Sequence, residues 1–168
     1  MENAPFLISN LLKAIIQQQG RYMTNHIQEM ADSPVTNIWP DFFPNGAPPE
    51  GAIPPSGDFF RITNKPKPTK KCLASDFEKD PDILDMRTGL QVVCSYGVSL
   101  QNTIEGARAT VGRFKNATRK RYIAKATLNE NVGRVMQTFK EDYHHTLWSF
   151  QGVETHTYFS CFEVVEPK

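Results

Sequence analysis

The sequence predicts an α+β fold in which a central, mainly antiparallel or mixed sheet with flanking helices follows an N-terminal helical arm. A β-branched run at residues 90–98 leads directly into a helical pattern that ends near Phe114. Segments rich in aromatic and β-branched residues then dominate residues 122–165. No internal repeat interrupts this order, so we expect the strands to share one sheet.

The composition is typical of a globular domain. The chain has 168 residues, of which 39% are hydrophobic and 22% are charged, and a formal net charge of +1. The apolar content excludes a disordered chain, and no apolar run is long enough to predict a transmembrane helix. The small net charge argues against a dedicated DNA-coating protein. Because the first residues lack the order of a secretory signal, we expect a cytoplasmic protein.

Residues 1–32 are predicted to form the helical arm. Between Phe6 and Met30 the apolar residues recur at three- and four-residue steps, with a break expected at Gly20. The polar face lacks the Lys and Arg enrichment of a membrane anchor. We therefore expect the arm to contact the domain, a second copy or another protein, and not a membrane.

Residues 33–57 are predicted to be a proline-rich linker. Seven of the twelve prolines lie there, so neither a helix nor a strand can be continuous. Trp39, Phe42 and Phe43 form an apolar cluster within this segment. A fully solvated linker would not need three aromatic residues, so the cluster predicts contact with the domain.

Residues 58–168 are predicted to form the α+β domain. Asn102 and Glu105 form a capping-box pattern near the start of its main helix. The acidic residues 76–85 lack the glycine and glutamate of a calcium loop, so they predict a solvated loop. The expected elements are a strand at 58–63, a short helix starting at Asp80-Pro81, a strand at 90–98, a helix from Leu100 to Phe114, and strands at 122–128, 132–139 and within 155–165.

The three cysteines are too far apart for a CxxC metal site and odd in number for a disulfide framework. We expect reduced thiols, with Cys94 and Cys161 as small hydrophobic residues in strands.

Arg61 lies inside the predicted strand at 58–63. An arginine there either points to solvent or enters a cleft where an anion binds its fork of donors. Ser95, Tyr96 and Ser99 stand where the predicted strand at 90–98 opens into a helix. Small hydroxylated residues at such a place let a ligand approach the backbone, although ordinary helix capping also explains them.

His144 and His145 belong to the run His-His-Thr-Leu-Trp that ends at Trp148. Adjacent histidines in an extended segment point to opposite faces, so they do not readily chelate one ion, and no metal site is predicted. Two interpretations stay open. Either one histidine faces a pocket with Trp148 as a stacking wall, or both lie on the surface beside a core tryptophan.

Six Lys and Arg residues fall between Arg113 and Lys125 with no acidic residue among them. This run is either a solvated surface or a phosphate or RNA contact.

These motifs resemble known proteins. The segments Phe59 to Thr63, Tyr96 to Ser99, Tyr122 to Ala124 and His144 to Trp148 resemble, in this order, a group of small bacterial proteins of unassigned function with a Phe-Arg-Ile-Thr strand and a His-His-Thr-Leu-Trp motif. More distantly, the order of elements resembles the ADP-ribosyltransferase and RES-domain toxin fold. In that fold a first-strand arginine and a following strand-end serine or tyrosine hold NAD.

The resemblance implies an NAD-binding, toxin-like protein that transfers ADP-ribose or hydrolyses NAD. His145 and Glu154 would act at the oxocarbenium-like centre or position the acceptor. We also expect Arg61 and residues 144–148 to share one cleft. The residues implied to bind NAD are Arg61, Ser95, Tyr96, Ser99, His144 and Trp148.

Two alternatives remain open. A non-enzymatic interaction, immunity or accessory protein would use the arm and the linker to wrap a partner. An RNA-binding or RNA-cleaving protein would use the basic run and the histidines, and ranks third.

Overall fold

The computed structural model describes residues 17–18, 37–114 and 118–167. It divides the chain into two units, Met1–Thr36 and Asn37–Lys168. Residues 17–18 are helical, while the rest of the predicted arm and residues 33–36 of the predicted linker lie outside the described residues.

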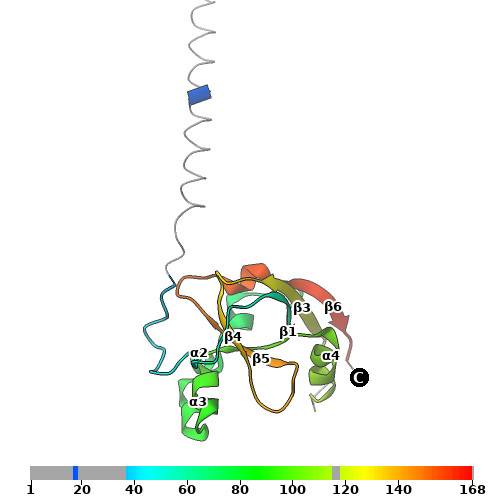
Figure 1. Ribbon diagram of the computed structural model, residues 1–168. Coiled ribbons are helices and arrows are strands. Elements are labelled where there is room, and N and C mark those ends of the chain that lie inside the picture. The colour runs from blue at the N-terminus through cyan, green and yellow to red at the C-terminus, as the bar shows by residue number, and fades with distance from the viewer. Residues whose placement is uncertain (1–16, 19–36, 115–117, 168) are drawn as a thin grey trace, which may run out of the picture. The chain divides into compact units, whose positions relative to one another are not determined.

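The predicted α+β class is confirmed, because the second unit is built on one six-stranded antiparallel sheet with helices against it (Figure 1). The strand order is β4-β5-β2-β1-β3-β6. The strands are β1 (Gly57–Thr63), β2 (Val98–Gln101), β3 (Arg121–Leu128), β4 (Gly133–Gln137), β5 (His144–Ser149) and β6 (Ser160–Val165).

The two faces of the sheet carry separate apolar clusters. Because successive side chains of a strand point to opposite faces, the neighbours Phe59 and Phe60 enter different clusters. Phe60 packs with Ile123 of β3 and with Ala107 of helix α4 (Ile104–Gly112). Phe59 belongs to the larger cluster on the opposite face, which includes Leu100 and Leu147.

The strand predicted at residues 90–98 is wrong. Residues Leu90–Ser95 form helix α3, and β2 begins only at Val98. The indole nitrogen of Trp148 donates to the Val93 carbonyl at 3.1 Å, which ties α3 to β5. Gly97 then lets the chain pass close to β5, since a Cβ there would lie 2.4 Å from Cγ2 of Thr146. Tertiary packing therefore overrides the β-branched propensity of this run.

The predicted start of the main helix is also wrong. Leu100 is a fully buried residue of β2, and α4 begins at Ile104. Its cap is Thr103, whose hydroxyl accepts from the Gly106 amide at 3.0 Å. A residue inside the β2–β5 ladder cannot also serve as the first apolar residue of a helix, which shortens the predicted element.

The strands predicted at 58–63, 122–128 and 132–139 are confirmed as β1, β3 and β4, with ends that differ by a few residues. The predicted final strand is shorter, because Thr155–Tyr158 forms the 3-10 helix η3 and β6 begins at Ser160. The expectation that both named cysteines lie in strands is wrong for Cys94. That residue is buried in α3, whereas Cys161 is exposed on β6.

The segment 37–57 belongs to the same unit as the sheet. Trp39 packs on Phe150 with ring centroids 4.5 Å apart, and Phe42 stacks on Phe77 at 5.7 Å. A backbone bridge also joins Ile53 to Val135 of β4. The predicted attachment of this segment by its aromatic residues is therefore confirmed.

Candidate functional site

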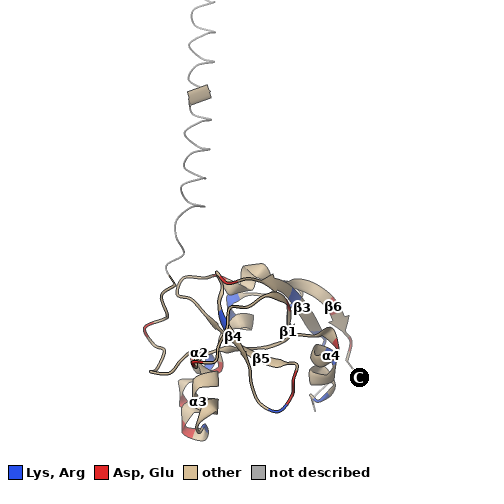
Figure 2. Cartoon of the chain, in the orientation of Figure 1, with Lys and Arg blue, Asp and Glu red and all other residues tan. Residues whose placement is uncertain are grey.

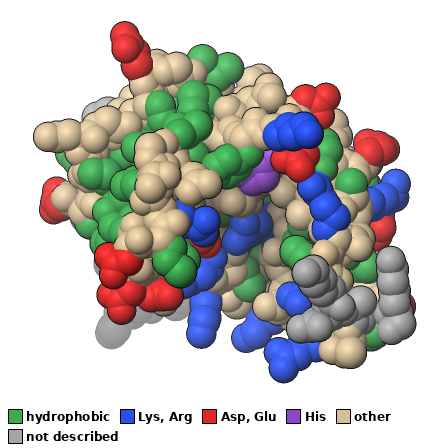
Figure 3. Space-filling view, turned by 90° about the horizontal axis from the view of Figure 1, so that it is seen from below, with side chains coloured by type: hydrophobic (Ala, Val, Ile, Leu, Met, Phe, Trp, Pro, Cys, Tyr) green, Lys and Arg blue, Asp and Glu red, His purple; other side chains and the backbone are tan. Residues whose placement is uncertain are grey.

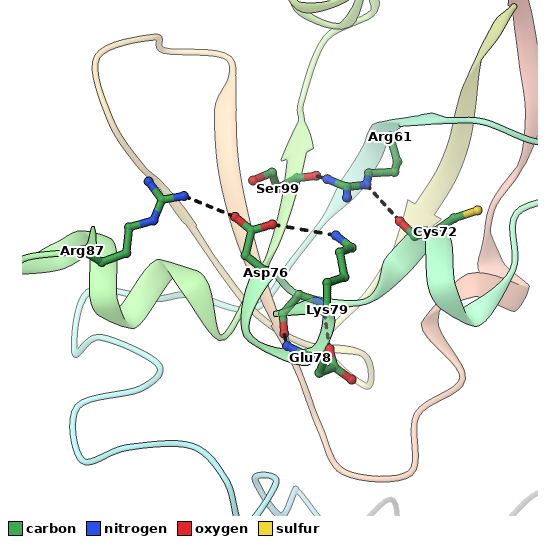
Figure 4. Close-up of polar contacts among 8 residues, drawn as sticks. Arg61, Cys72, Asp76, Glu78, Lys79, Arg87 and Ser99 are labelled. Atoms are coloured by element: carbon green, nitrogen blue, oxygen red, sulfur yellow. Dashed lines mark hydrogen bonds and ion pairs between the residues drawn. The ribbon is translucent and has the colours of Figure 1, made fainter. Parts of the chain in front are cut away.

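Arg61 lies where β1 and β2 separate. β1 pairs with β3 along its whole length, but it pairs with β2 only at Phe60 and Gln101. Beyond this pair the partly buried Arg61 joins the two strands through its side chain (Figure 4). Its Nε donates to the Cys72 carbonyl at 3.2 Å, and its Nη1 donates to the Ser99 carbonyl at 2.5 Å. A charged donor thus links the two strands where backbone pairing has ended.

Two further cations lie around Asp76, and one of them, Lys79, is close enough to Arg61 for their charges to interact. Lys79, at the end of the short helix α2 (Asp76–Lys79), and Arg87 both approach Asp76, with nitrogen–oxygen distances of 3.8 and 3.7 Å (Figure 4). Burial lowers the pKa of Lys79, and the positive charge of Arg61 lowers it further. We call Arg61, Lys79 and Arg87, with Asp76 between them, the cationic cluster.

The cationic cluster is incompletely satisfied. Among the described residues, Nε of Arg87 is buried and has no hydrogen-bond partner. Asp76 contacts Lys79 and Arg87 only at the long end of the ion-pair range, and its own side chain is 55% exposed. An unpaired buried donor and crowded like charges both carry a free-energy cost, which a bound anion would reduce.

The two histidines of β5 lie across β2 from Arg61. His144 is paired with Gln101 and His145 with Leu100, so they point to opposite faces of the sheet, as predicted. The ring of His145 lies edge-on to the ring of Phe59 of β1, with ring centroids 5.9 Å apart. Burial lowers the pKa of His144, and the charges of His145 and Arg61 lower it further. Figure 3 shows one histidine near the centre of the face seen from below, with basic and acidic side chains close to it.

A cavity lies at the end of the sheet where β2 begins. This cavity of about 320 Å³ has Tyr96 and Glu154 among its lining residues. Tyr96 packs on Phe77 with ring centroids 4.4 Å apart. Glu154 faces His156, whose Nδ1 lies 3.4 Å from the carboxylate. We call this cavity the aromatic pocket.

The structure separates the predicted site residues into these two places. Arg61 and Ser99 meet at the cationic cluster, and the charge of Arg61 acts on His144. Tyr96 and Glu154 line the aromatic pocket, and His145 is not part of that lining. His145 and Glu154 therefore have different surroundings.

Two predicted roles are wrong. Trp148 cannot be the wall of a shared cleft, because it is fully buried and its indole nitrogen is bonded to Val93. Ser95 does not stand at a strand end, since it is buried in α3 and its hydroxyl donates to the Gln91 carbonyl at 2.9 Å. A helix placed against β5 explains both outcomes.

Sequence reasoning missed Lys79, Arg87 and Asp76. Asp76 and Lys79 lie in the stretch 76–85 that the sequence pattern predicts to be a solvated acidic loop, and Arg87 follows it by two residues. One local signal was present, because Ser75 and Glu78 form a capping box in which the Ser75 amide donates to the Glu78 carboxylate at 2.7 Å. That motif predicts α2 and places Asp76 and Lys79 on one side of a helical turn.

Much of the basic run is paired with carboxylates. Arg113 contacts Glu141 at 2.6 Å, Lys120 contacts Glu166 at 2.8 Å, and Lys125 contacts Asp58 at 2.7 Å. Lys115 lies outside the described residues. These pairs favour the interpretation of the run as ordinary surface.

Comparison with protein-family models, curated proteins and solved structures gives no match for this chain. Within the described residues, no group of His, Cys, Asp and Glu side chains is arranged to hold a metal ion.

None of the helices that the structure describes has the length and apolar character needed to cross a membrane.

Proposed function

We propose that the cationic cluster binds the phosphate groups of a nucleotide, and that this nucleotide is NAD, which the protein uses for ADP-ribosyl transfer or hydrolyses. The observation that carries the proposal is the excess of the positive charges of Arg61, Lys79 and Arg87 over the carboxylates of Asp76 and Glu78, near the point where β1 and β2 separate.

The chemistry of the cluster suits a diphosphate. The unpaired Nε of Arg87 is a donor without an acceptor, and a guanidinium binds phosphate oxygens in a planar, two-point geometry. Lys79 offers a point charge with three donors. An anion between these two side chains would satisfy the buried donor and screen Lys79 from Arg61.

Arg61 takes a different role from the one the resemblance implies. Two of its three guanidinium nitrogens already donate to backbone carbonyls. We therefore assign it as a positioning residue that links β1 to β2 and adds positive charge, while Lys79 and Arg87 contact the ligand directly.

The reaction itself rests on the resemblance. Transfer of ADP-ribose passes through an oxocarbenium-like centre, which a carboxylate or an oriented imidazole stabilises. His145 beside Phe59 and Glu154 beside Tyr96 are the candidates, with Ser99 supplying a backbone contact to Arg61.

Calorimetric titration of the full chain with NAD, and separately with inorganic pyrophosphate, tests the binding step. Lys79→Met and Arg87→Met should each weaken NAD binding about tenfold or more, because each removes a charged hydrogen bond. Lys120→Met is the matched control, since Lys120 is exposed and pairs with Glu166, and it should bind like the wild type.

Chromatographic measurement of nicotinamide release then tests the reaction. Absence of saturable NAD binding, or equal affinities of all three variants, would overturn the binding proposal. Binding without nicotinamide release would limit the protein to nucleotide binding.

A non-enzymatic interaction protein is the second candidate. It is favoured by two exposed apolar side chains on the segment 37–57, Ile38 at 53% and Ile53 at 63% exposure. If this segment mediates self-association, the double variant Ile38→Ser, Ile53→Ser should shift sedimentation equilibrium toward the monomer. Unchanged sedimentation would exclude that contact.

A further inference from the structure

The aromatic pocket has a wall of aromatic rings. Phe42, Phe43, Tyr96 and Phe150 are all among its lining residues. Phe43 lies edge-on to Phe42 with centroids 5.2 Å apart and edge-on to Tyr96 at 6.2 Å. Trp39 packs against Phe150 at 4.5 Å, which supports that ring from the side of the 37–57 segment. The wall is therefore a continuous packed cluster and not a set of isolated side chains.

The remaining lining is richer in acidic than in basic groups. Asp41, Glu78 and Glu154 contribute carboxylates, whereas Lys70 is the one lysine of the lining. Glu78 is held in place by the Ser75 amide at 2.7 Å, and the Glu154 side chain stays 58% exposed while facing His156. This arrangement disfavours an anion, which would meet these carboxylates.

Aromatic faces and carboxylates attract the same kind of ligand. The face of an aromatic ring carries negative electrostatic potential, so it attracts a cation that can shed its water. A methylated ammonium group sheds water easily because its methyl groups cannot donate strong hydrogen bonds. The cavity of about 320 Å³ has room for such a group together with the rest of a small ligand.

We propose that the aromatic pocket binds a trimethylammonium group, held against the partly exposed ring of Phe42 and the carboxylate of Glu154. Such a group occurs in small molecules such as choline and in trimethylated lysine side chains. The proposal does not depend on phosphate binding at the cationic cluster, because none of the cluster residues belongs to the pocket lining. It does share Glu154 with the proposed ADP-ribosyl reaction, so the two ligands would compete for that carboxylate.

Ligand-observed NMR of the full chain tests the proposal. The probes are choline, its uncharged isostere 3,3-dimethylbutan-1-ol and a short peptide carrying trimethyllysine. Choline should bind about tenfold more tightly than the isostere, because a desolvated cation–π contact adds attraction that the neutral compound lacks. The N-methyl resonance should also shift upfield under the aromatic ring current. If the peptide binds more tightly than choline, the natural ligand is a trimethylated protein. If choline binds more tightly than the peptide, the natural ligand is a small molecule.

Two variants and two matched controls locate the site. Phe42→Leu and Glu154→Gln should each weaken choline binding several-fold. Phe162→Leu on β6 and Glu130→Gln before β4 change an exposed aromatic and an exposed acidic residue elsewhere, and should bind choline like the wild type. Phe42 is 44% exposed, so its replacement should leave the domain folded, which thermal unfolding checks. Absence of choline binding, equal affinity for the isostere, or unchanged binding by both pocket variants would overturn the proposal.

Discussion

The cationic cluster and the aromatic pocket share one four-residue helix, α2, and differ in how their groups are satisfied. Asp76 and Lys79 of α2 belong to the cluster, whereas Phe77 and Glu78 face the pocket side. In the cluster, cations crowd around one carboxylate and a buried donor has no partner. In the pocket, the rings pack on one another and Glu78 completes a capping box. Tertiary structure thus concentrates unsatisfied charge on one side of α2 and packed aromatic surface on the other.

Replacing Arg61 should have the largest effect on stability. Arg61→Met leaves the carbonyls of Cys72 and Ser99 without their charged donor, so we expect the free energy of unfolding to fall by about 2 to 4 kcal/mol in urea denaturation. Lys79→Met is the contrast within the cluster. Because Lys79 is partly desolvated and stands beside the Arg61 charge, its removal should not lower stability. Equal losses in the two variants would show that the cluster is an ordinary network of stabilising pairs.

Shortening the aromatic wall should have the next largest effect. Tyr96→Leu removes the contact with Phe77 and the edge-on contact with Phe43, so we expect a loss of about 1 to 2 kcal/mol, measured by urea denaturation. Tyr96→Phe keeps the ring and should stay close to the wild type. A loss in Tyr96→Phe as large as in Tyr96→Leu would assign the stabilisation to the hydroxyl group and contradict the packing argument.

Acidification should lower the stability of the domain through His144, whose pKa is lowered by burial and further by the charge of Arg61 in the cationic cluster. Burial lowers the pKa of His144 below its ordinary value of 6.5, so the unfolded chain takes up a proton at a pH where the folded chain does not. The free energy of unfolding should therefore fall as the pH drops below about 6.5, by at most about 1.4 kcal/mol per pH unit for one proton. His144→Asn should remove this part of the slope. If the free energies of unfolding of the wild type and His144→Asn differ by the same amount at every pH between 8 and about 5, the assignment to His144 is contradicted.

An exposed ion pair outside both regions should show the smallest effect. Hydrogen bonds from Lys125 and Thr127 lower the pKa of Asp58, so its contribution is present above the ordinary value of 3.8 and is lost as the pH falls below it. At neutral pH, Asp58→Asn should leave the urea midpoint almost unchanged, because exposed pairs contribute little. A clear loss at neutral pH would show that surface pairing matters here as much as the buried Arg61 contacts.

The local sequence pattern was sufficient to predict those strands whose apolar side chains alternate between the two faces of the sheet. β1 and β3 alternate between the two apolar clusters, and both were predicted at nearly their observed ends. The aromatic residues of the 37–57 segment also predicted contact with the domain, because exposed rings without a partner are unfavourable. The opposite directions of His144 and His145 followed from strand geometry alone.

The functional surroundings did not follow from local pattern. Nothing in the sequence neighbourhood of Arg61 shows that β1 and β2 part after one residue pair, or that the carbonyls of Cys72 and Ser99 take its donors. Trp148 reads as a candidate stacking residue in its motif, but the placement of α3 buries it. Lys79 belongs to the stretch predicted as a solvated loop, but α2 places it near the Arg61 charge and beside Asp76, which Arg87 also contacts.

The sequence by itself determined the α+β class, the positions of most strands and the residues able to carry anion or ring chemistry, since these depend on periodicity and residue type. Tertiary structure alone decided which of those residues meet. Lys79 and Arg87 meet at Asp76 near the Arg61 charge, while Tyr96 meets Glu154 and the rings of the 37–57 segment in one pocket lining. The physical reason is that hydrophobic periodicity specifies which face of an element is buried, whereas the meeting of distant side chains depends on strand order and on the gap between β1 and β2.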